Sequence, residues 1–377
     1  MKIYILVFTT FVFTLYAGYS RPPKCQPLSA DIHNETLTKL QKETCEKLNA
    51  PGAVLYVRFP DGSIWKKAYG LASIDDSGSQ KIETDMQFRI ASVTKTFIGS
   101  AILQLVGENR FHLNDNMEKL LPGFLNYGEK ITVKMLLNHS SAIPNYATTD
   151  EFTDKWVENF TYNWSKEELF GFIKNEDLLD KPGHEGYYSN SNYYLLGLLI
   201  EKYSQKSLPE YLKDKIFDPI GLTNTYFPTT DKLGGKYADG YFDFNENGLF
   251  ESNEVVTDQN PSAIWAAGMI VSDIHDLSLW IDELFTGTLI TPQLQKIRLD
   301  MNMQLHGAPE FVKMGLAVAS IDGAEGHTGA IPGFTSVLFR YKGADIIALS
   351  NCFHTKKDMG SVAETLLQKV KTQILDK

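Results

Sequence analysis

Cysteine is scarce in this sequence: its 377 residues include three, Cys25, Cys45 and Cys352. Their spacing fits no zinc motif, so a structural zinc site is not expected. In an oxidising compartment Cys25 and Cys45 would be able to pair across a short loop, while three unpaired thiols explain the same pattern equally well. Both interpretations stay open, and none of the chemistry inferred below needs a cysteine.

Positive charge is also scarce relative to negative charge. The 36 Lys and Arg residues are outnumbered by 46 Asp and Glu residues, and the formal net charge is −10. No basic cluster of the kind that binds nucleic acid occurs, so nucleic acid is not an expected partner. The sequence also lacks a P-loop, a glycine-rich dinucleotide fingerprint and a paired-histidine motif such as H-E-x-x-H. No cofactor and no metal is therefore expected, and His139 and His184 are interpreted as structural residues.

The first twenty residues differ in kind from the rest of the chain. Lys2 is followed by an unbroken apolar and aromatic run, and then by the small residues Gly18 and Ser20. This layout predicts a signal peptide, residues 1–20, and a secreted or periplasmic protein with no membrane contact after cleavage. An uncleaved membrane anchor is the alternative, because the run is near the lower length limit for spanning a bilayer, roughly 17–25 residues.

Strand-like and helix-like patterns alternate in blocks along residues 26–377, the predicted folded domain. A β-hairpin is expected where two β-prone runs flank the turn Pro60-Asp61-Gly62. The hairpin strands are expected at 53–59 and 63–70, later strands at 311–320, 335–343 and 345–351, and helices at 35–49, from Thr94 onward, in patches of 110–230 and at 358–375. This order predicts an α+β fold, with a sheet region (about 35–100 and 255–377) and an inserted, mostly helical region (about 101–230).

Ser92 and Lys95 stand at the start of the helix expected from Thr94, in the sequence S-V-T-K. Residues three apart at a helix start lie on one face, so the Lys95 amine is able to reach the Ser92 hydroxyl. The amine can take a proton at neutral pH only if burial or a nearby positive charge lowers its pKa from about 10.4. A second copy, Ser63-x-x-Lys66, lies on the expected hairpin and is interpreted as surface, because strand positions three apart point to opposite faces.

Two further segments carry polar groups that would complete such a site. Tyr188-Ser189-Asn190 directly precedes an apolar helix. Its phenol can ionise and shuttle protons near cations, and its amide can hold a lysine and a substrate at once. His327-Thr328-Gly329 lies between two strand-like runs among glycines that leave the backbone open to a ligand. Taken singly, the first segment is an ordinary helix entry and the second a loop with a satisfied histidine.

Together the three motifs occur in the order and approximate spacing of a family that this sequence resembles, the serine β-lactamase and penicillin-binding-protein superfamily. Within it, the branch related to class C β-lactamases and D-Ala-D-Ala carboxypeptidases is the most similar. The similarity extends from PGAVLYV and FRIASVTKTF through ITVKMLLNHSSAIPNY, PGHEGYYSNSNYYLLG and AAGMIVSDIHDL to GHTGAIPGF, and S-x-x-K is a signature of the superfamily. The resemblance implies the β-lactamase/transpeptidase-like fold, an antiparallel sheet flanked by helices.

The resemblance also implies a role for each motif residue. Ser92 would be the acylated nucleophile, Lys95 its proton partner, and Tyr188 the general base and acid toward water and the leaving group. The substrate would be bound by Asn190, His327, Thr328, Gly329 and Ala330. The backbone N–H groups of Ser92 and Ala330 would form the oxyanion hole, where one donor is commonly worth about 3 kcal/mol in the transition state.

Two positions depart from the pattern of the family. β-Lactamases and many penicillin-binding proteins have lysine where this sequence has His327. An imidazole, only partly protonated at neutral pH, would bind a substrate carboxylate less firmly than an ammonium group. This departure favours a D,D-carboxypeptidase, an esterase or a D-amino-acid peptidase over a true β-lactamase. Ser141-Ala142 stands where relatives usually have Ser-Gly, and it is expected to affect packing more than chemistry.

The segment from Asp243 to Glu254 fits an EF-hand calcium loop position by position. Calcium is nevertheless not expected, because an EF-hand needs a helix on each side. The preceding ADGYF is strand-like, and Asn247-Gly248 is typical of a hairpin turn.

The sequence therefore predicts a hydrolase that forms an acyl-enzyme through Ser92, preferentially a D-alanyl-D-alanine carboxypeptidase-like peptidase. An esterase or β-lactamase with the same machinery is the first alternative. A non-catalytic penicillin-binding or scaffold protein is the second. The expected partner is a small peptide, ester or β-lactam, with the stem peptide of peptidoglycan as one candidate.

Overall fold

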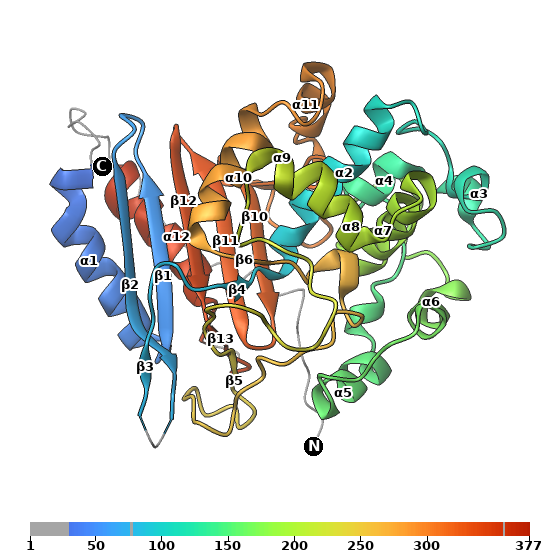
Figure 1. Ribbon diagram of the computed structural model, residues 1–377. Helices are drawn as coiled ribbons and strands as arrows, with labels where there is room; N and C mark the ends of the chain where they lie inside the picture. Colours follow the sequence, from blue (N-terminus) through green and yellow to red (C-terminus); the bar gives the residue numbers. More distant parts are fainter. Residues whose placement is uncertain (1–29, 76–77, 357–358) are drawn as a thin grey trace.

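The computed structural model describes residues 30–75, 78–356 and 359–377 (Figure 1). The predicted signal peptide and Cys25 lie outside these residues, so signal cleavage and the Cys25–Cys45 pair stay predictions. The thiols of Cys45 and Cys352 are both buried. None of the helices in the described ranges combines the length and the apolar character that crossing a membrane requires.

Within the described residues, a nine-stranded sheet in the order β3-β2-β1-β12-β11-β10-β9-β8-β7 forms the centre of the fold. Its strands are β1 (Gly52–Arg58), β2 (Ile64–Ser73), β3 (Gln80–Lys81), β7 (Met303–Gln304), β8 (Val312–Met314), β9 (Ala319–Ile321), β10 (Ala324–Ile331), β11 (Phe334–Tyr341) and β12 (Ala344–Ser350). Neighbouring strands are antiparallel throughout. The early and late strands meet where β1 pairs with β12, from Ala53 opposite Ser350 to Arg58 opposite Asp345. The predicted α+β fold, with a sheet drawn from both ends of the chain, is confirmed.

Two short strand pairs lie outside this sheet. Strand β4 (Phe88–Arg89) pairs with β6 (Val271–Ser272), and β5 (Tyr241–Phe242) pairs with β13 (Cys352–Phe353). The first pair leads directly into the S-V-T-K segment, and it therefore ties that segment to a part of the chain about 180 residues further on.

Helices cover both faces of the sheet. They are α1 (Ala30–Lys47), α2 (Thr94–Gly107), α3 (Met117–Leu120), α4 (Val133–Leu137), α5 (Asp150–Glu158), α6 (Lys166–Lys174), α7 (Asn190–Ser204), α8 (Leu208–Leu212), α9 (Asp218–Ile220), α10 (Ile274–Thr286), α11 (Pro292–Arg298) and α12 (Val362–Val370). Helices α1 and α12 lie against one face, while the helical region containing α2, α7 and α10 lies against the other (Figure 1).

The sequence of β1 explains how one strand contributes side chains to the hydrophobic cores on both faces of the sheet. Val54 and Tyr56 belong to the core shared with the helical region, and Ala53, Leu55 and Val57 belong to the core shared with α1 and α12. Alternate side chains of a strand point to opposite faces, so an unbroken apolar run is what a strand covered on both sides requires. The active-site segment described below lies in the layer on the side of the helical region.

Several predicted boundaries differ from the structure. Helix α1 begins at Ala30 instead of residue 35, and the last helix begins at Val362 instead of residue 358. The predicted strand 311–320 is wrong: it is two strands, β8 and β9, that fold back on each other with Met314 opposite Ala319. The turn between them holds Ala317 at a positive φ of 63°, and a side chain at Gly315 would lie 2.2 Å from the Arg298 carbonyl oxygen. Apolar alternation alone does not reveal such a reversal.

The segment from Asp243 to Glu254 has the structure of a turn following β5. The Asp243 carboxylate accepts hydrogen bonds from the backbone N–H groups of Asn247 and Gly248, at 3.1 and 3.0 Å. The Glu254 carboxylate accepts from the backbone N–H groups of Phe244 and Glu251, at 3.2 and 3.1 Å. The carboxylates that resemble calcium ligands are thus bound by the loop's own donors, and strand rather than helix precedes the loop.

Candidate active site

Ser92 lies on a short 3₁₀ helix (Ala91–Val93) between strand β4 and helix α2, and hydrogen bonds of the residues before it fix the course of the chain. The buried Arg89 guanidinium donates to the backbone carbonyl groups of Asp231, Thr257 and Gln259. The backbone N–H of Ile90 donates to the Ile270 carbonyl at 3.0 Å. Ala91 then adopts a positive φ of 47°, a conformation that a residue with a Cβ rarely takes. Ser92 therefore follows a strained backbone turn that several hydrogen bonds stabilise, and its exposed fraction is 2%.

The Lys95 side chain is fully buried beside Ser92. Its Nζ lies 2.9 Å from Ser92 Oγ, 2.8 Å from Asn190 Oδ1 and 2.7 Å from the Ala267 carbonyl oxygen. Burial holds the pKa of Lys95 well below its ordinary value, because a buried ammonium group loses its hydration. The structure therefore favours the neutral amine.

Counting donors and acceptors shows what a neutral Lys95 can do. The amide oxygen of Asn190 and the carbonyl oxygen of Ala267 can only accept hydrogen bonds. A neutral amine has two N–H donors and one lone pair, so these two oxygens use both donors. The lone pair of a neutral Lys95 can accept the hydroxyl proton of Ser92, whose Oγ lies 2.9 Å from Nζ. This arrangement is suited to removing the proton of a serine nucleophile.

Tyr188 and Asn190 come from the N-terminal end of α7, in contact with the Ser92–Lys95 pair. The centre of the Tyr188 ring lies 5.1 Å from Lys95 Nζ. Burial raises the pKa of the Tyr188 phenol, while its hydrogen bond with Ser92 acts in the opposite direction. Asn190 is fully buried, and its Nδ2 has no hydrogen-bond partner among the described residues. The expectation of an easily ionised phenol is therefore not supported, because burial away from water favours the neutral phenol.

His327 lies on strand β10 with an exposed fraction of 3%, not in the loop that its motif taken singly would suggest. Its Nδ1 lies 2.5 Å from the Thr328 carbonyl oxygen. Since a carbonyl group only accepts, Nδ1 must carry the donated hydrogen. Burial lowers the pKa of His327 to about 3, with the hydrogen bond to the Thr328 carbonyl opposing it. The predicted partly protonated imidazole is wrong for this structure: His327 is neutral, and its buried Nε2 is an acceptor with no partner among the described residues.

The remaining motif residues bring β10 against the nucleophile turn. A side chain at Gly329 would lie 2.4 Å from the Ile90 carbonyl oxygen and 2.3 Å from Ser336 Oγ, so only glycine permits this approach. Ser336 Oγ donates to the same Ile90 carbonyl at 2.7 Å. Thr328 and Ala330 are half-buried on the same strand. All three motifs are thus brought together around Ser92, while the role of the Ser92 and Ala330 backbone N–H groups as an oxyanion hole stays a prediction.

Two contributors were not predicted from the sequence. Ala267 supplies a backbone carbonyl oxygen to Lys95, and backbone groups leave no trace in a side-chain pattern. His139 is buried with its ring stacked on Tyr188, at 4.2 Å between ring centres. It was interpreted as structural, although its place in the segment LLNHSSA, which belongs to the family resemblance, was a signal that could have singled it out.

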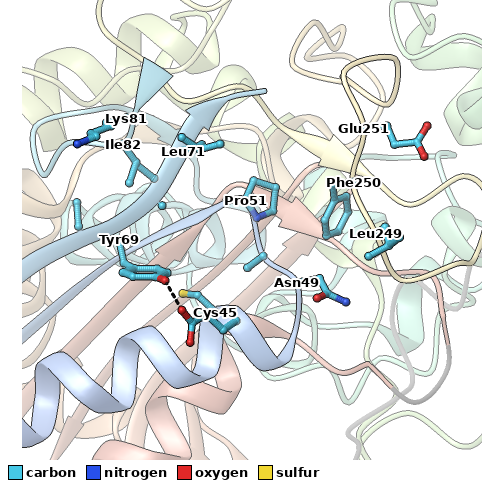
Figure 2. Close-up of a pocket in the computed structure, with 14 residues that line it drawn as sticks. Cys45, Asn49, Pro51, Tyr69, Leu71, Lys81, Ile82, Leu249, Phe250 and Glu251 are labelled. Atoms are coloured by element: carbon cyan, nitrogen blue, oxygen red, sulfur yellow. Dashed lines mark hydrogen bonds between the residues drawn. The ribbon is translucent and has the colours of Figure 1, made fainter. Parts of the chain in front are cut away.

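A separate hollow of about 920 Å³ lies at the other end of the sheet, between the end of α1, the start of β1, strand β2 and the 243–254 loop (Figure 2). Tyr69, whose hydroxyl donates to Glu46 at 2.9 Å, lines one side and Phe250 another. Burial raises the pKa of the Cys45 thiol there to about 12, so the thiol stays protonated. None of the motif residues lines this hollow, and the candidate active site is the Ser92 region.

Comparison with known proteins gives a consistent result. Protein flp of Staphylococcus aureus (strain N315) is 32% identical over 253 residues, which are 66% of this chain and 48% of that protein. A candidate D-alanyl-D-alanine carboxypeptidase of Escherichia coli (strain K12) is 26% identical over 226 residues, 56% of this chain and 51% of that protein. The matches thus span about half the length of these curated relatives.

Solved structures agree over most of the chain. A D-stereospecific amidohydrolase from Streptomyces sp. has a TM-score of 0.75 and 27% identity, covering 88% of this chain and 97% of that one. D-amino acid amidase from Ochrobactrum anthropi SV3, in complex with L-phenylalanine amide, has a TM-score of 0.76 at 23% identity, covering 91% and 97%. The second likeness shows the fold alone.

The fold, these neighbours and a matching family model define the class of protein as the β-lactamase and penicillin-binding-protein superfamily, a superfamily of serine hydrolases. A family model described as Beta-lactamase matches residues 37–371. The chain belongs to this family.

Proposed function

We propose that this protein hydrolyses amide bonds of D-residues through an acyl-enzyme on Ser92. The observation that carries the proposal is the buried Lys95 amine, which donates to Asn190 and the Ala267 carbonyl and faces the Ser92 hydroxyl at 2.9 Å. Ser92 Oγ attacks the scissile carbonyl carbon while Lys95 takes the hydroxyl proton. The neutral Tyr188 phenol donates a proton to the leaving amine and is reprotonated by Lys95, which gives up the proton taken from Ser92. Water then attacks the acyl carbon, and its proton passes through Lys95 to the departing Ser92 Oγ.

D-Alanyl-D-alanine carboxypeptidase-like cleavage is the first specific form of this activity. The three motifs and the similarity to the candidate carboxypeptidase of Escherichia coli support it. The second form is an amidase or esterase that acts on substrates without a free carboxylate. The neutral state of His327 favours this second form, because a neutral acceptor offers no positive charge to a carboxylate.

One matched pair of substrates separates the two forms. N-acyl-D-Ala-D-Ala and its C-terminal carboxamide differ only in the charge of the group next to the scissile bond. A carboxypeptidase hydrolyses the free acid faster, whereas an amidase hydrolyses the carboxamide at least as fast. Loss of both activities, with fluorophosphonate still labelling Ser92, would favour an esterase.

A β-lactamase and a non-catalytic penicillin-binding protein are distinguished by the fate of the acyl group. Intact mass after incubation with a penicillin shows whether an adduct forms and how long it lasts. A transient adduct with turnover indicates a β-lactamase, and a permanent adduct together with no hydrolysis of any peptide, amide or ester indicates a binding protein. Absence of any adduct on Ser92 with all reagents contradicts the proposal.

We also propose that the protein is secreted or periplasmic. The support is the sequence of residues 1–20, with Lys2 before an apolar run and small residues at Gly18 and Ser20. Expression of the full chain in a secreting host should yield a protein that begins at Arg21. A product retained in the membrane with Met1 present would instead indicate an uncleaved anchor.

A further inference from the structure

His139 lies just after helix α4, in a backbone conformation that a histidine rarely adopts. Its φ is 63°, in the left-handed region, and its side chain is fully buried. Such a conformation costs about 1–3 kcal/mol and persists where surrounding contacts demand it. His139 contacts the three residues centred on Tyr188, and its ring also meets Asn192 Nδ2 at 3.4 Å and the Tyr193 ring at 5.3 Å between ring centres.

His139 makes two hydrogen bonds to the backbone on either side of Tyr188 and one ring contact with Tyr188 itself. The backbone N–H of Tyr187 donates to the His139 carbonyl at 2.7 Å. The backbone N–H of Ser189 donates to His139 Nδ1 at 3.1 Å. Between these two bonds, the imidazole stacks on the Tyr188 ring with 4.2 Å between ring centres and 27° between planes. The backbone on each side of Tyr188 and the ring itself are therefore held by His139.

The hydrogen bond from Ser189 also fixes the chemical form of the imidazole. A backbone N–H can only donate, so Nδ1 must be unprotonated and the ring hydrogen must lie on Nε2. Burial holds the pKa of His139 well below its ordinary value. A neutral ring stacked on Tyr188 adds no positive charge next to Lys95, which the mechanism requires to be neutral.

We propose that His139 is a positioning residue that holds the Tyr188 hydroxyl in reach of the leaving group through its stacked ring and its two backbone hydrogen bonds. This inference rests on the proposed function, in which Tyr188 is the proton donor to the leaving amine. His139 does not contact the reacting atoms in this account. Its effect is confined to the step that needs the Tyr188 proton.

The test uses two substrates with the same D-alanyl acyl group, a p-nitroanilide and a p-nitrophenyl ester. The anilide leaving group needs a proton, whereas p-nitrophenolate leaves without one. His139→Asn keeps an acceptor near the Nδ1 position and tolerates a positive φ, but it removes the stacked ring. We expect it to lower kcat for the anilide about ten- to a hundred-fold, since displacement of a catalytic group by about 1 Å costs about that much. The kcat for the ester should fall about three-fold or less, because its leaving group needs no proton from a displaced Tyr188.

A double-mutant cycle decides whether His139 acts through Tyr188. If it does, the pair His139→Asn and Tyr188→Phe should lose no more anilide activity than Tyr188→Phe alone. Additive losses, or equal losses on anilide and ester, would overturn the proposal and leave His139 a structural residue. If the His139→Asn protein does not fold, His139→Phe replaces it in the same comparison of substrates and in the same double-mutant cycle. This variant keeps a ring and removes the acceptor.

Two controls separate this inference from the proposed function. His112→Asn, at an exposed histidine, should change neither substrate's rate. Ser92→Ala tests the acyl-enzyme itself: if that protein still hydrolyses both substrates, the proposed function fails. If Ser92 is required but the cycle is additive, only the role of His139 fails.

Discussion

The chain contains S-x-x-K twice, and the two copies share nothing but their spacing. At the tip of the β1–β2 hairpin, Ser63 Oγ donates to the Asp61 carboxylate at 2.6 Å and accepts from the Ala30 backbone N–H at 2.8 Å. Lys66 is exposed on β2. At the start of α2, Ser92 and Lys95 are both buried and in contact with each other.

The difference arises from local backbone and from burial, not from the residue types. Positions three apart on an extended strand point to opposite faces, whereas on a 3₁₀ or α-helical turn they share one face. An amine in water keeps its proton, whereas burial away from water disfavours the charged form of an amine and lowers its pKa. A serine beside a lysine therefore becomes a candidate nucleophile only where the fold removes the lysine's proton.

The largest expected effect distinguishes the two serines. Ser92→Ala should lower hydrolysis by about four orders of magnitude or more and abolish covalent labelling, because it removes the attacking oxygen. The thermal midpoint should change little. The measurement is intact mass after fluorophosphonate treatment together with kcat/KM. Persistent labelling of the Ser92→Ala protein would mean that another residue is the nucleophile.

Substitution of the two lysines, Lys95 and Lys66, should change the activity by almost as different an amount. Lys95→Arg places a permanent cation where a neutral base is required, so activity should fall about 10²- to 10⁴-fold. Lys66→Arg is the matched control and should leave the rate unchanged. In the parent protein a base must be neutral to act, so kcat/KM should decline as the pH falls through the Lys95 pKa, which burial has lowered. A pH profile that rises only above the ordinary lysine pKa would contradict the buried-base account.

A smaller effect on substrate preference should come from a positive charge introduced at His327, close to the buried Ser92–Lys95 pair. His327→Lys should raise kcat/KM for N-acyl-D-Ala-D-Ala relative to its carboxamide about ten-fold, since a charge-assisted hydrogen bond is typically worth about 1.5–3 kcal/mol. In the parent protein the ratio should stay flat from about pH 8 to about pH 5, because the pKa of His327 lies near 3. A ratio that rises as the pH falls through about 6.5, the ordinary histidine value, would show that the imidazole becomes charged when substrate binds.

Ser63→Ala should affect stability and leave catalysis alone. It removes the hydrogen bonds with Asp61 and with the Ala30 backbone N–H, so the free energy of unfolding should fall by about 1 kcal/mol. Urea unfolding and a parallel kcat/KM measurement check this prediction. A loss of hydrolysis larger than the loss of folded protein would give the hairpin copy an unexpected part in the reaction.

The smallest expected effect is that of chelation, which should be none. The Asp243 and Glu254 carboxylates accept hydrogen bonds from their own loop, and no step of the proposed reaction uses a cation. Activity and thermal midpoint should be equal in EDTA and in calcium. An EDTA-dependent loss that calcium restores would make the 243–254 loop a metal site.

The strand-like runs were sufficient to predict the sheet from both chain ends, and the resemblance of three short motifs to a known superfamily implied the gathering of Ser92, Lys95, Tyr188 and His327. Their protonation was not predictable. It depends on burial by β10, α7 and the residues around Ala267, which are far apart in the chain. The reversal at Gly315 was also missed, since the approach of the Arg298 carbonyl that requires glycine is a tertiary contact.

The pairing of β1 with β12 has a consequence for the synthesis of the protein. Ser350 Oγ donates to the Gly52 carbonyl, across 298 positions of sequence. A chain emerging from the ribosome makes β1 long before its hydrogen-bonding partner β12, whose Ser350 comes 298 residues after Gly52. Until then one side of β1 remains an exposed edge, and contacts of such long range form slowly. Emergence of β12 is therefore expected to set the moment at which the sheet closes, and a chain that has not yet made β12 is the form in greatest need of a chaperone.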